Sequence, residues 1–304
     1  MPTRLRDALR FLWGTLFKFF GDGCPTMAAS LSFYTFFSLP ALLSLLLLFV
    51  GGFADPQEVE RAITEQAGGL IGRAGGDQVR VILTHARQTY VDRSAAALVS
   101  VAAVLFGATT AFAQLQDALN KVWSVKPDPR RNEIQNFLAK RVFSFGVVMA
   151  VAFLLLVSLA LSAVLAAFGA LVTGGLGAPA VLLQWANELF SFVVIASLFA
   201  VMFKLLPDAR IAWSDVWAGA LATALLFVLG KNVIGFYLGR TDPGNAYGAA
   251  GSLAVVLIWV YYSSMILLFG AEFTRGWAER YGSGVKPEKG AVEVVEEEHA
   301  VQRG

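Results

Sequence analysis

Residues 142–187 read VFSFGVVMAVAFLLLVSLALSAVLAAFGALVTGGLGAPAVLLQWAN, and none of these 46 residues is charged. An apolar α-helix needs about 20 residues to cross the hydrocarbon core of a bilayer. The stretch is too long for one crossing, and the cluster of glycines between Thr173 and Pro179 is typical of a tight turn. It therefore predicts a helical hairpin with a very short connection inside a membrane.

The rest of the chain has the same character. Of its 304 residues, 57% are hydrophobic and 15% are charged, whereas ordinary soluble domains carry about 25% charged residues. This composition excludes a disordered chain, a disulfide scaffold and a collagen-like repeat, and it disfavours a soluble enzyme. The uninterrupted apolar runs lack the alternation of membrane β-strands, so they predict an all-α integral membrane protein.

Six stretches are long and apolar enough to be transmembrane helices: Thr26–Phe53, Ser94–Leu115, Val142–Phe168, Ala180–Leu206, Ala212–Leu238 and Ala246–Phe273. Seventeen of the 24 Lys and Arg residues fall on one side of these spans and six on the other. Cytoplasmic loops carry the excess of positive charge in membrane proteins. The sequence thus predicts six spans with both termini in the cytoplasm.

Three segments follow from this pattern: a cytoplasmic amphipathic segment at 1–22, the six-span domain at 23–280 and a disordered cytoplasmic tail at 281–304. The first has apolar residues at helical spacing with Arg6 and Arg10 elsewhere on the helix, which predicts an interfacial helix on the inner membrane surface.

The first outer loop, residues 54–93, is long for a connector. Asp55 and Pro56 form a helix start signal, and Gly68 and Gly69 would end that helix. A second apolar repeat begins at Val79. We expect two short amphipathic helices here, on the outer face or plugging a cavity.

Polar residues inside the spans are few, and a polar group in hydrocarbon usually faces the bundle interior. Helical spacing places Ser30, Tyr34 and Ser38 on one stripe. A second stripe, formed by Thr110, Gln114, Asp117 and Lys121, runs from the span that ends at Leu115 out to the cytoplasmic surface. Nine residues are therefore candidates for a substrate or ion pathway: Tyr34, Ser38, Thr110, Gln114, Asp117, Lys121, Glu188, Lys231 and Glu272. The competing interpretation is that these groups only form interhelical hydrogen bonds.

Glu188 is the strongest of these candidates for a functional residue. If its helix begins at Ala180, the acid lies about 12 Å into the span and must be paired, protonated or in contact with water; Lys231 is then a partner. If the helix begins near Gln184, Glu188 lies at the outer interface. Glu272 is instead expected to form a salt bridge with Arg275 or with Lys204, while Asp215 is the remaining charge inside a span.

No catalytic constellation is present in the sequence. His85 and His299 have no neighbours at metal-ligand spacing, and the single Cys24 excludes a disulfide within one chain. We therefore expect no enzyme activity, no metal and no cofactor.

Four segments carry a family resemblance: LSFYTFFSLP at 31–40, GATTAFAQLQDALNKVW at 107–123, KLLPDARIAWSDVW at 204–217, and YGAAGS at 247–252 with the following WVYYS at 259–263 and GAEFT at 270–274. Together they resemble the YihY/BrkB family of bacterial inner-membrane proteins over about residues 10–280. The resemblance implies six spans with both termini inside the cell, in agreement with the charge count. The family was once labelled ribonuclease BN, and a member is associated with serum resistance in a pathogen.

A nuclease would need a metal or an acid–base pair, and the loop 116–141 carries ordinary positive-inside charge, so we expect no nucleic-acid partner. The first functional hypothesis is a transporter-like or lipid-handling protein, which binds a lipid or a small-molecule substrate. The alternative is a non-transporting scaffold or envelope-biogenesis factor. A homo-oligomer and an envelope protein partner are both compatible with the sequence.

The shape of the bundle separates these hypotheses. An interior cavity lined by Tyr34, Gln114, Asp117 and Glu188 would favour transport. A packed interior with an exposed apolar groove would favour the scaffold, or lipid transfer along the groove.

Overall fold

The structure is a computed structural model, and it describes residues 3–50, 56–89, 95–128, 180–241, 251–288 and 290–294. Within these residues it is almost entirely helical. The predicted third span, Val142–Phe168, and the turn that follows it lie outside the described residues.

Five long helices correspond to the other predicted spans: α2 (Cys24–Val50), α4 (Ala95–Val122), α6 (Ala180–Leu205), α7 (Trp213–Thr241) and α9 (Gly251–Tyr281). Within the described ranges, four stretches are long and apolar enough to cross a membrane: Cys24–Leu43, Glu188–Leu205, Trp213–Tyr237 and Leu253–Tyr281. The all-α prediction is therefore confirmed for these parts of the chain.

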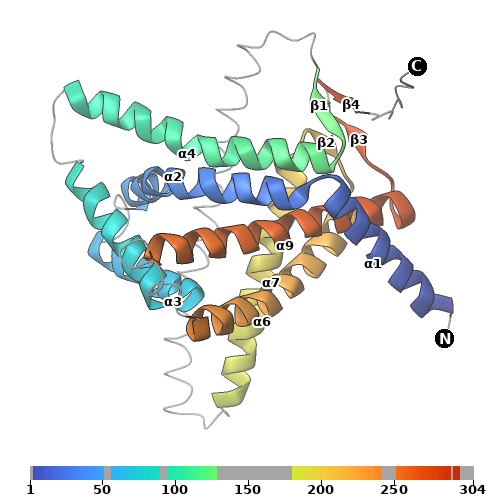
Figure 1. Cartoon of the computed structure of the whole chain (residues 1–304), viewed down its shortest axis with the longest axis horizontal. Helices are drawn as coiled ribbons and strands as arrows, with labels where there is room; N and C mark the ends of the chain where they lie inside the picture. The colour runs from blue at the N-terminus through green and yellow to red at the C-terminus, as the bar shows by residue number, and fades with distance from the viewer. Residues whose placement is uncertain are drawn as a thin grey trace, which may run out of the picture.

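The helix bundle is centred on α2 and α9. Figure 1 shows α2 between α4 and α9, and it contacts both of them. Helix α7 packs against α9 on one side and α6 on the other. The main buried cluster joins all five helices, with Leu119 and Phe203 among its fully buried side chains.

Helix α4 continues seven residues beyond the predicted end of its span at Leu115. The extension is polar in sequence, but Gln116 and Asn120 are buried against the connection between α6 and α7. Tertiary hydrogen bonds thus stabilise a helical end that hydropathy alone assigns to a loop.

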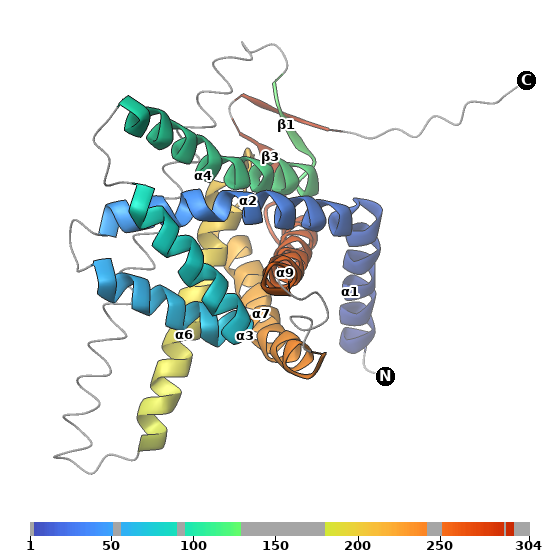
Figure 2. The same cartoon turned by 60° about the vertical axis from the view of Figure 1, so that its left-hand side comes forward.

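Helix α1 (Thr3–Gly21) is the predicted amphipathic helix. The chain turns at Gly23, which has a positive φ of 70°, and Figure 2 shows α1 turned away from the line of α2. On one side, the Phe11 ring packs edge-on against Phe273 of α9. On the other side, large apolar side chains such as Trp13 and Phe17 are exposed.

Helix α3 (Pro56–Thr89) is a helical run that doubles back on itself (Figure 1). The Thr84 hydroxyl lies 3.5 Å from a carboxylate oxygen of Glu60, although a straight helix would separate residues this far apart by about 36 Å. A Cβ at Gly76 would approach the Gly68 Cα to 3.0 Å, which places the bend between these glycines. The predicted end of a first helix at Gly68 is wrong, because α3 continues as one helical run to Thr89, but the run does fold into two arms, with its bend between Gly68 and Gly76.

Two short antiparallel sheets involve the C-terminal tail: β1 (Val125–Pro127) pairs with β4 (Ala291–Glu293), and β2 (Ala209–Arg210) pairs with β3 (Lys286–Pro287). The prediction of disorder from residue 281 onward is therefore wrong for residues 286–287 and 291–293. These residues have no periodic pattern of their own, and the backbones of two distant loops supply their hydrogen-bond partners.

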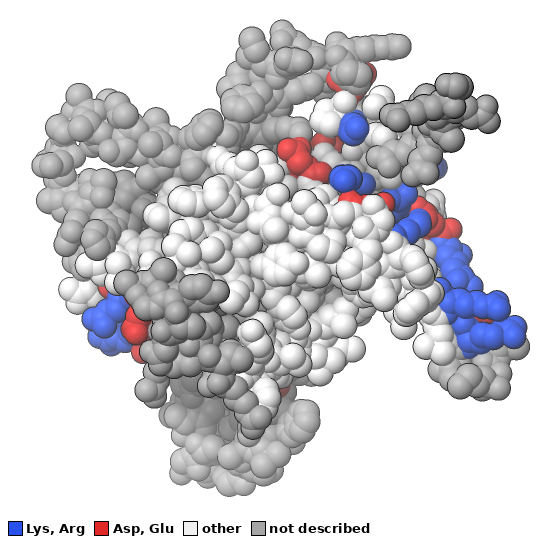
Figure 3. Space-filling model, viewed as in Figure 1, with Lys and Arg blue, Asp and Glu red and all other residues white. Residues whose placement is uncertain are grey.

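Charge is concentrated at the ends of the molecule. Figure 3 shows Lys and Arg side chains along α1 and around the strands at one end, with a broad uncharged face over the helices beside them. Helix α1 and the C-terminal strands occupy this same end (Figure 1). The charged side chains thus lie toward the ends of the helix bundle, and the surface between them is uncharged.

Candidate functional site

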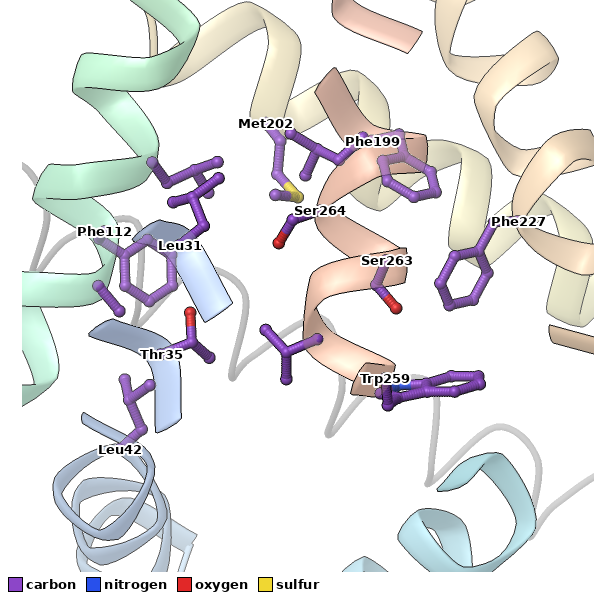
Figure 4. Close-up of a pocket in the computed structure, with 14 residues that line it drawn as sticks. Leu31, Thr35, Leu42, Phe112, Phe199, Met202, Phe227, Trp259, Ser263 and Ser264 are labelled. Atoms are coloured by element: carbon purple, nitrogen blue, oxygen red, sulfur yellow. The ribbon is translucent and has the colours of Figure 1, made fainter. Parts of the chain in front are cut away.

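An apolar cavity of about 300 Å³ lies between the long helices (Figure 4). Five helices contribute to its wall: Leu31, Thr35 and Leu42 come from α2; Ala111, Phe112 and Leu115 from α4; Phe199 and Met202 from α6; Phe227 from α7; and Trp259, Val260, Ser263, Ser264 and Leu267 from α9. Its volume is at the lower end of the range of about 300–1,000 Å³ for small-molecule sites.

Helical spacing explains how the sequence builds this wall. On α9, the lining residues Val260, Ser263, Ser264 and Leu267 follow the i, i+3, i+4, i+7 pattern of a single helix face. Two of these four residues are serines and two are aliphatic, and hydropathy does not show whether such a face is enclosed or exposed. Only the packing of the other four helices turns this face into a cavity wall.

Among the described residues, the polar side-chain groups in this wall are the hydroxyls of Thr35, Ser263 and Ser264 and the indole N–H of Trp259. The Ser263 Oγ atom is buried, and among the described residues it has no hydrogen-bond partner. The remaining lining is aliphatic, aromatic or thioether, and its largest side chains are Trp259 and the three phenylalanines Phe112, Phe199 and Phe227. The cavity thus suits an apolar ligand that carries a hydrogen-bonding group.

The nine predicted pathway residues all belong to the described ranges, and none of them is among the described residues that line this cavity. On α2, Tyr34 is 37% exposed and Ser38 is buried, so the first predicted stripe does not face one environment. On α4, Thr110 and Gln114 are half-buried, whereas Asp117 and Lys121 are exposed. Their proposed role in a pathway stays a prediction.

Glu188 lies on the surface of α6. The helix begins at Ala180, so the alternative start near Gln184 is wrong. The Glu188 side chain is nevertheless exposed, next to Leu189, which is 65% exposed. No ion pair joins Glu188 to the half-buried Lys231 in the part of the chain that the structure describes.

Glu272 is the most deeply buried of the predicted residues, with 1% of its surface exposed. The Cys24 thiol lies 3.8 Å from its Oε1 atom, and its Oε2 atom has no hydrogen-bond partner among the described residues. The contact between Cys24 and Glu272 thus joins the start of α2 to α9.

In the described part of the chain, Glu272 forms no salt bridge with Arg275 or Lys204, contrary to expectation. Arg275 instead donates from Nε to the Glu279 carboxylate at 2.8 Å and from Nη1 to the Val122 carbonyl at 2.6 Å. Lys204 donates to the Ile211 carbonyl and lies 5.6 Å from the centre of the Trp213 ring. Backbone carbonyls at the ends of helices and loops compete successfully for both cations.

Asp208 connects three parts of the chain, and sequence reasoning missed this role. Its carboxylate accepts hydrogen bonds from Gln116 at 3.2 Å and from Asn120 at 2.8 Å. Its backbone N–H donates to the Asn120 side chain at 2.7 Å, and its carbonyl accepts from the Glu288 N–H at 2.9 Å. The only available signal was the position of Asp208 within the 204–217 segment.

Asp215, predicted only as a charge inside a span, anchors the C-terminal end of α9. Its Oδ2 atom accepts a hydrogen bond from the Ser283 N–H at 3.2 Å, and a side chain at Gly282 would overlap its carboxylate. The described residues contain no group of three or more His, Cys, Asp or Glu residues that could hold a metal ion.

A bundle of long apolar helices around an apolar cavity defines this chain as an α-helical membrane protein. The model of the family described as "Virulence factor BrkB" matches residues 15–293, and the chain belongs to this family. The resemblance seen in the sequence is thereby confirmed.

Curated relatives are described as UPF0761 membrane proteins. One from Verminephrobacter eiseniae is 27% identical over 89% of this chain and 64% of its own length. One from Ralstonia nicotianae is 28% identical over 82% of this chain and 54% of its own length. The chain thus spans less than two thirds of the length of these relatives. No solved structure matches this chain.

Proposed function

We propose that this protein is a lipid-handling membrane protein that holds an apolar chain of a lipid in the cavity between α2, α4, α6, α7 and α9. The observation that carries the proposal is the lining of the cavity, which among the described residues is apolar apart from three hydroxyl groups and the indole N–H of Trp259. Burial of apolar surface is the dominant favourable contribution to binding such a ligand. The proposal assigns binding and passage of a lipid, and it requires no catalytic group.

The proposed setting is the bacterial inner membrane, with six spans, both termini in the cytoplasm and α1 on the inner surface. The position of α1 and the C-terminal strands at one end of the bundle supports a common side for both termini (Figure 1). The Lys and Arg side chains gathered there fit the positive-inside rule (Figure 3). The exposed Trp13 and Phe17 suit the boundary between headgroups and acyl chains.

Photocrosslinking in lipid nanodiscs tests the cavity. The purified full chain is illuminated with a phospholipid that carries a diazirine in one acyl chain, and the labelled peptides are mapped by mass spectrometry. We expect labels on the lining segments of α4 and α9. Labels confined to exposed residues of α7, such as Leu225 and Leu229, would contradict the proposal.

A matched pair of variants separates the cavity from the outer surface. Ala111 lines the cavity and is buried, whereas Ala29 is exposed on α2. Ala111→Phe should fill the cavity and abolish labelling of its wall, while Ala29→Phe adds the same side chain and should leave labelling unchanged. Equal labelling of both variants would overturn the proposal.

A further inference from the structure

The polar side-chain groups of the cavity come from two neighbouring helices. Thr35 belongs to α2, and Ser263 and Ser264 belong to α9 (Figure 4). One turn before Thr35, the Ser32 hydroxyl donates a 2.8 Å hydrogen bond to the Leu257 carbonyl of α9. This bond joins the two helices next to the cavity, so the three hydroxyl groups are held on a fixed framework.

Ser263 differs from other helical hydroxyl residues of this protein. The hydroxyls of Ser197, Thr223 and Thr274 each donate to the backbone carbonyl four residues earlier, at 2.8, 2.7 and 2.6 Å. The Ser263 Oγ atom is buried but, in the described part of the chain, has no partner at all. A buried hydroxyl without a hydrogen bond destabilises the folded protein, so a partner supplied by a ligand would be favourable.

The depth of Ser263 in the membrane restricts which ligand could supply the hydrogen-bond acceptor. Ser263 lies ten residues after the start of the apolar stretch Leu253–Tyr281, or about 15 Å along the helix. The hydrocarbon core of a bilayer is about 30 Å thick, so the hydroxyl is placed near its middle. Lipid chains supply no hydrogen-bond acceptor at that depth, whereas a lipid whose ester group enters the cavity does.

We infer that the cavity recognises acyl esters: the Ser263 hydroxyl donates a hydrogen bond to the ester carbonyl of a lipid, and the apolar wall holds the attached chain. This inference rests on the lipid-handling function proposed above. The aromatic rings of Phe112, Phe227 and Trp259 surround the apolar part of the ligand. In a bilayer the ester groups of phospholipids lie at the boundary of the hydrocarbon core. An ester bound by Ser263 would belong to a lipid that has moved toward the bilayer middle, as expected for a protein that moves lipids.

The test compares two phospholipids that differ only in their linkage. The full chain in detergent is crosslinked with the diazirine phospholipid, and unlabelled diester or diether phospholipid with the same headgroup and the same chain length competes. The ether lacks the carbonyl acceptor. We expect the diester to compete at a concentration about two- to tenfold lower, which is the contribution of one neutral hydrogen bond.

Variants then assign the preference to one hydroxyl. Ser263→Ala should make the two lipids equal competitors, and Ser263→Thr, which keeps a hydroxyl, should retain the preference for the ester. The control Ser197→Ala removes a hydroxyl that already has an acceptor and does not line the cavity, so it should behave as the wild type.

Each other outcome has a distinct meaning. Equal competition in the wild-type protein, or an ester preference that survives Ser263→Ala, overturns the inference but leaves the cavity as a site for apolar chains. Labelling that persists in Ala111→Phe shows instead that the lipid binds elsewhere, and then the proposed function itself fails.

Discussion

Gly219 of α7 faces Thr274 of α9 so closely that any side chain at Gly219 would overlap the threonine hydroxyl and its methyl group. The arrangement is reciprocal, because a side chain at Gly270 of α9 would overlap Thr223 of α7. Each threonine hydroxyl donates to the carbonyl of the glycine on its own helix, Thr223 to Gly219 and Thr274 to Gly270. Small residues that permit close helix approach are typical of membrane helix interfaces.

Gly219→Ala should destabilise the protein, because the new methyl group overpacks this contact, at a cost of about 1–3 kcal/mol. Thermal unfolding in detergent measures the change. Gly235→Ala, on the same helix with open space around it, should be neutral or stabilising by up to about 1 kcal/mol. The double variant Gly219→Ala/Thr274→Ala should recover much of the loss, and strict additivity of the two changes would refute direct contact.

Asp208→Asn should loosen the connection between α6 and α7. In the wild-type protein, each carboxylate oxygen of Asp208 accepts one hydrogen bond, from Gln116 or from Asn120. The asparagine amide replaces one of these oxygens by an NH₂ donor, so one of the two hydrogen bonds is lost. A buried polar group left unpaired costs about 1–3 kcal/mol. Hydrogen exchange should rise in residues 204–211 and in strand β3. Glu288→Gln is the control, because only the Glu288 backbone contacts Asp208. Unchanged hydrogen exchange in Asp208→Asn would show that these hydrogen bonds do not stabilise the connection between α6 and α7.

The single cysteine should be unreactive in the folded protein. Cys24 is fully buried, next to Glu272, so a polyethylene glycol maleimide should shift the protein on a gel only after denaturation. Cys24→Ala/Lys286→Cys moves the thiol to an exposed residue and should be labelled under native conditions. Rapid native labelling of Cys24 would contradict the packing of α2 against α9.

The exposed face of α1 should lie at the membrane surface. Trp13 is 63% exposed, so phospholipids brominated near the headgroup should quench its fluorescence more strongly than those brominated near the chain end. Trp13→Phe should remove this shallow quenching, whereas Trp123→Phe should not, since Trp123 is only 2% exposed. Equal quenching before and after Trp13→Phe would place α1 in water.

Glu188→Gln should leave lipid labelling and lipid movement unchanged. The Glu188 side chain is exposed and does not line the cavity, so removal of its charge alters neither the cavity wall nor its hydroxyl groups. Crosslinking and a lipid-scrambling assay in vesicles measure the two effects. If Glu188→Gln abolished lipid scrambling but left lipid labelling intact, Glu188 would belong to the transport pathway, as its position in the sequence predicted.

Local sequence features are sufficient to predict most of the long helices that the structure describes. Long apolar runs place α2, α6 and α7 within a few residues of their observed ends, whereas the glycine pair at Gly68 marks only one side of the bend in α3. These features depend on local composition and on the period of the α-helix, and both are present in the order of the residues.

Which residues come together depends on how the helices and loops pack. Ser263, Asp208 and the Gly219–Thr274 contact carry no distinctive local pattern, and each acquires its role from helices or loops far away in the chain. In a membrane helix the face toward lipid is as apolar as the face toward the core, so hydropathy cannot tell a cavity wall from an outer surface. The packing of neighbouring helices makes that distinction, because it alone fixes which apolar face is enclosed.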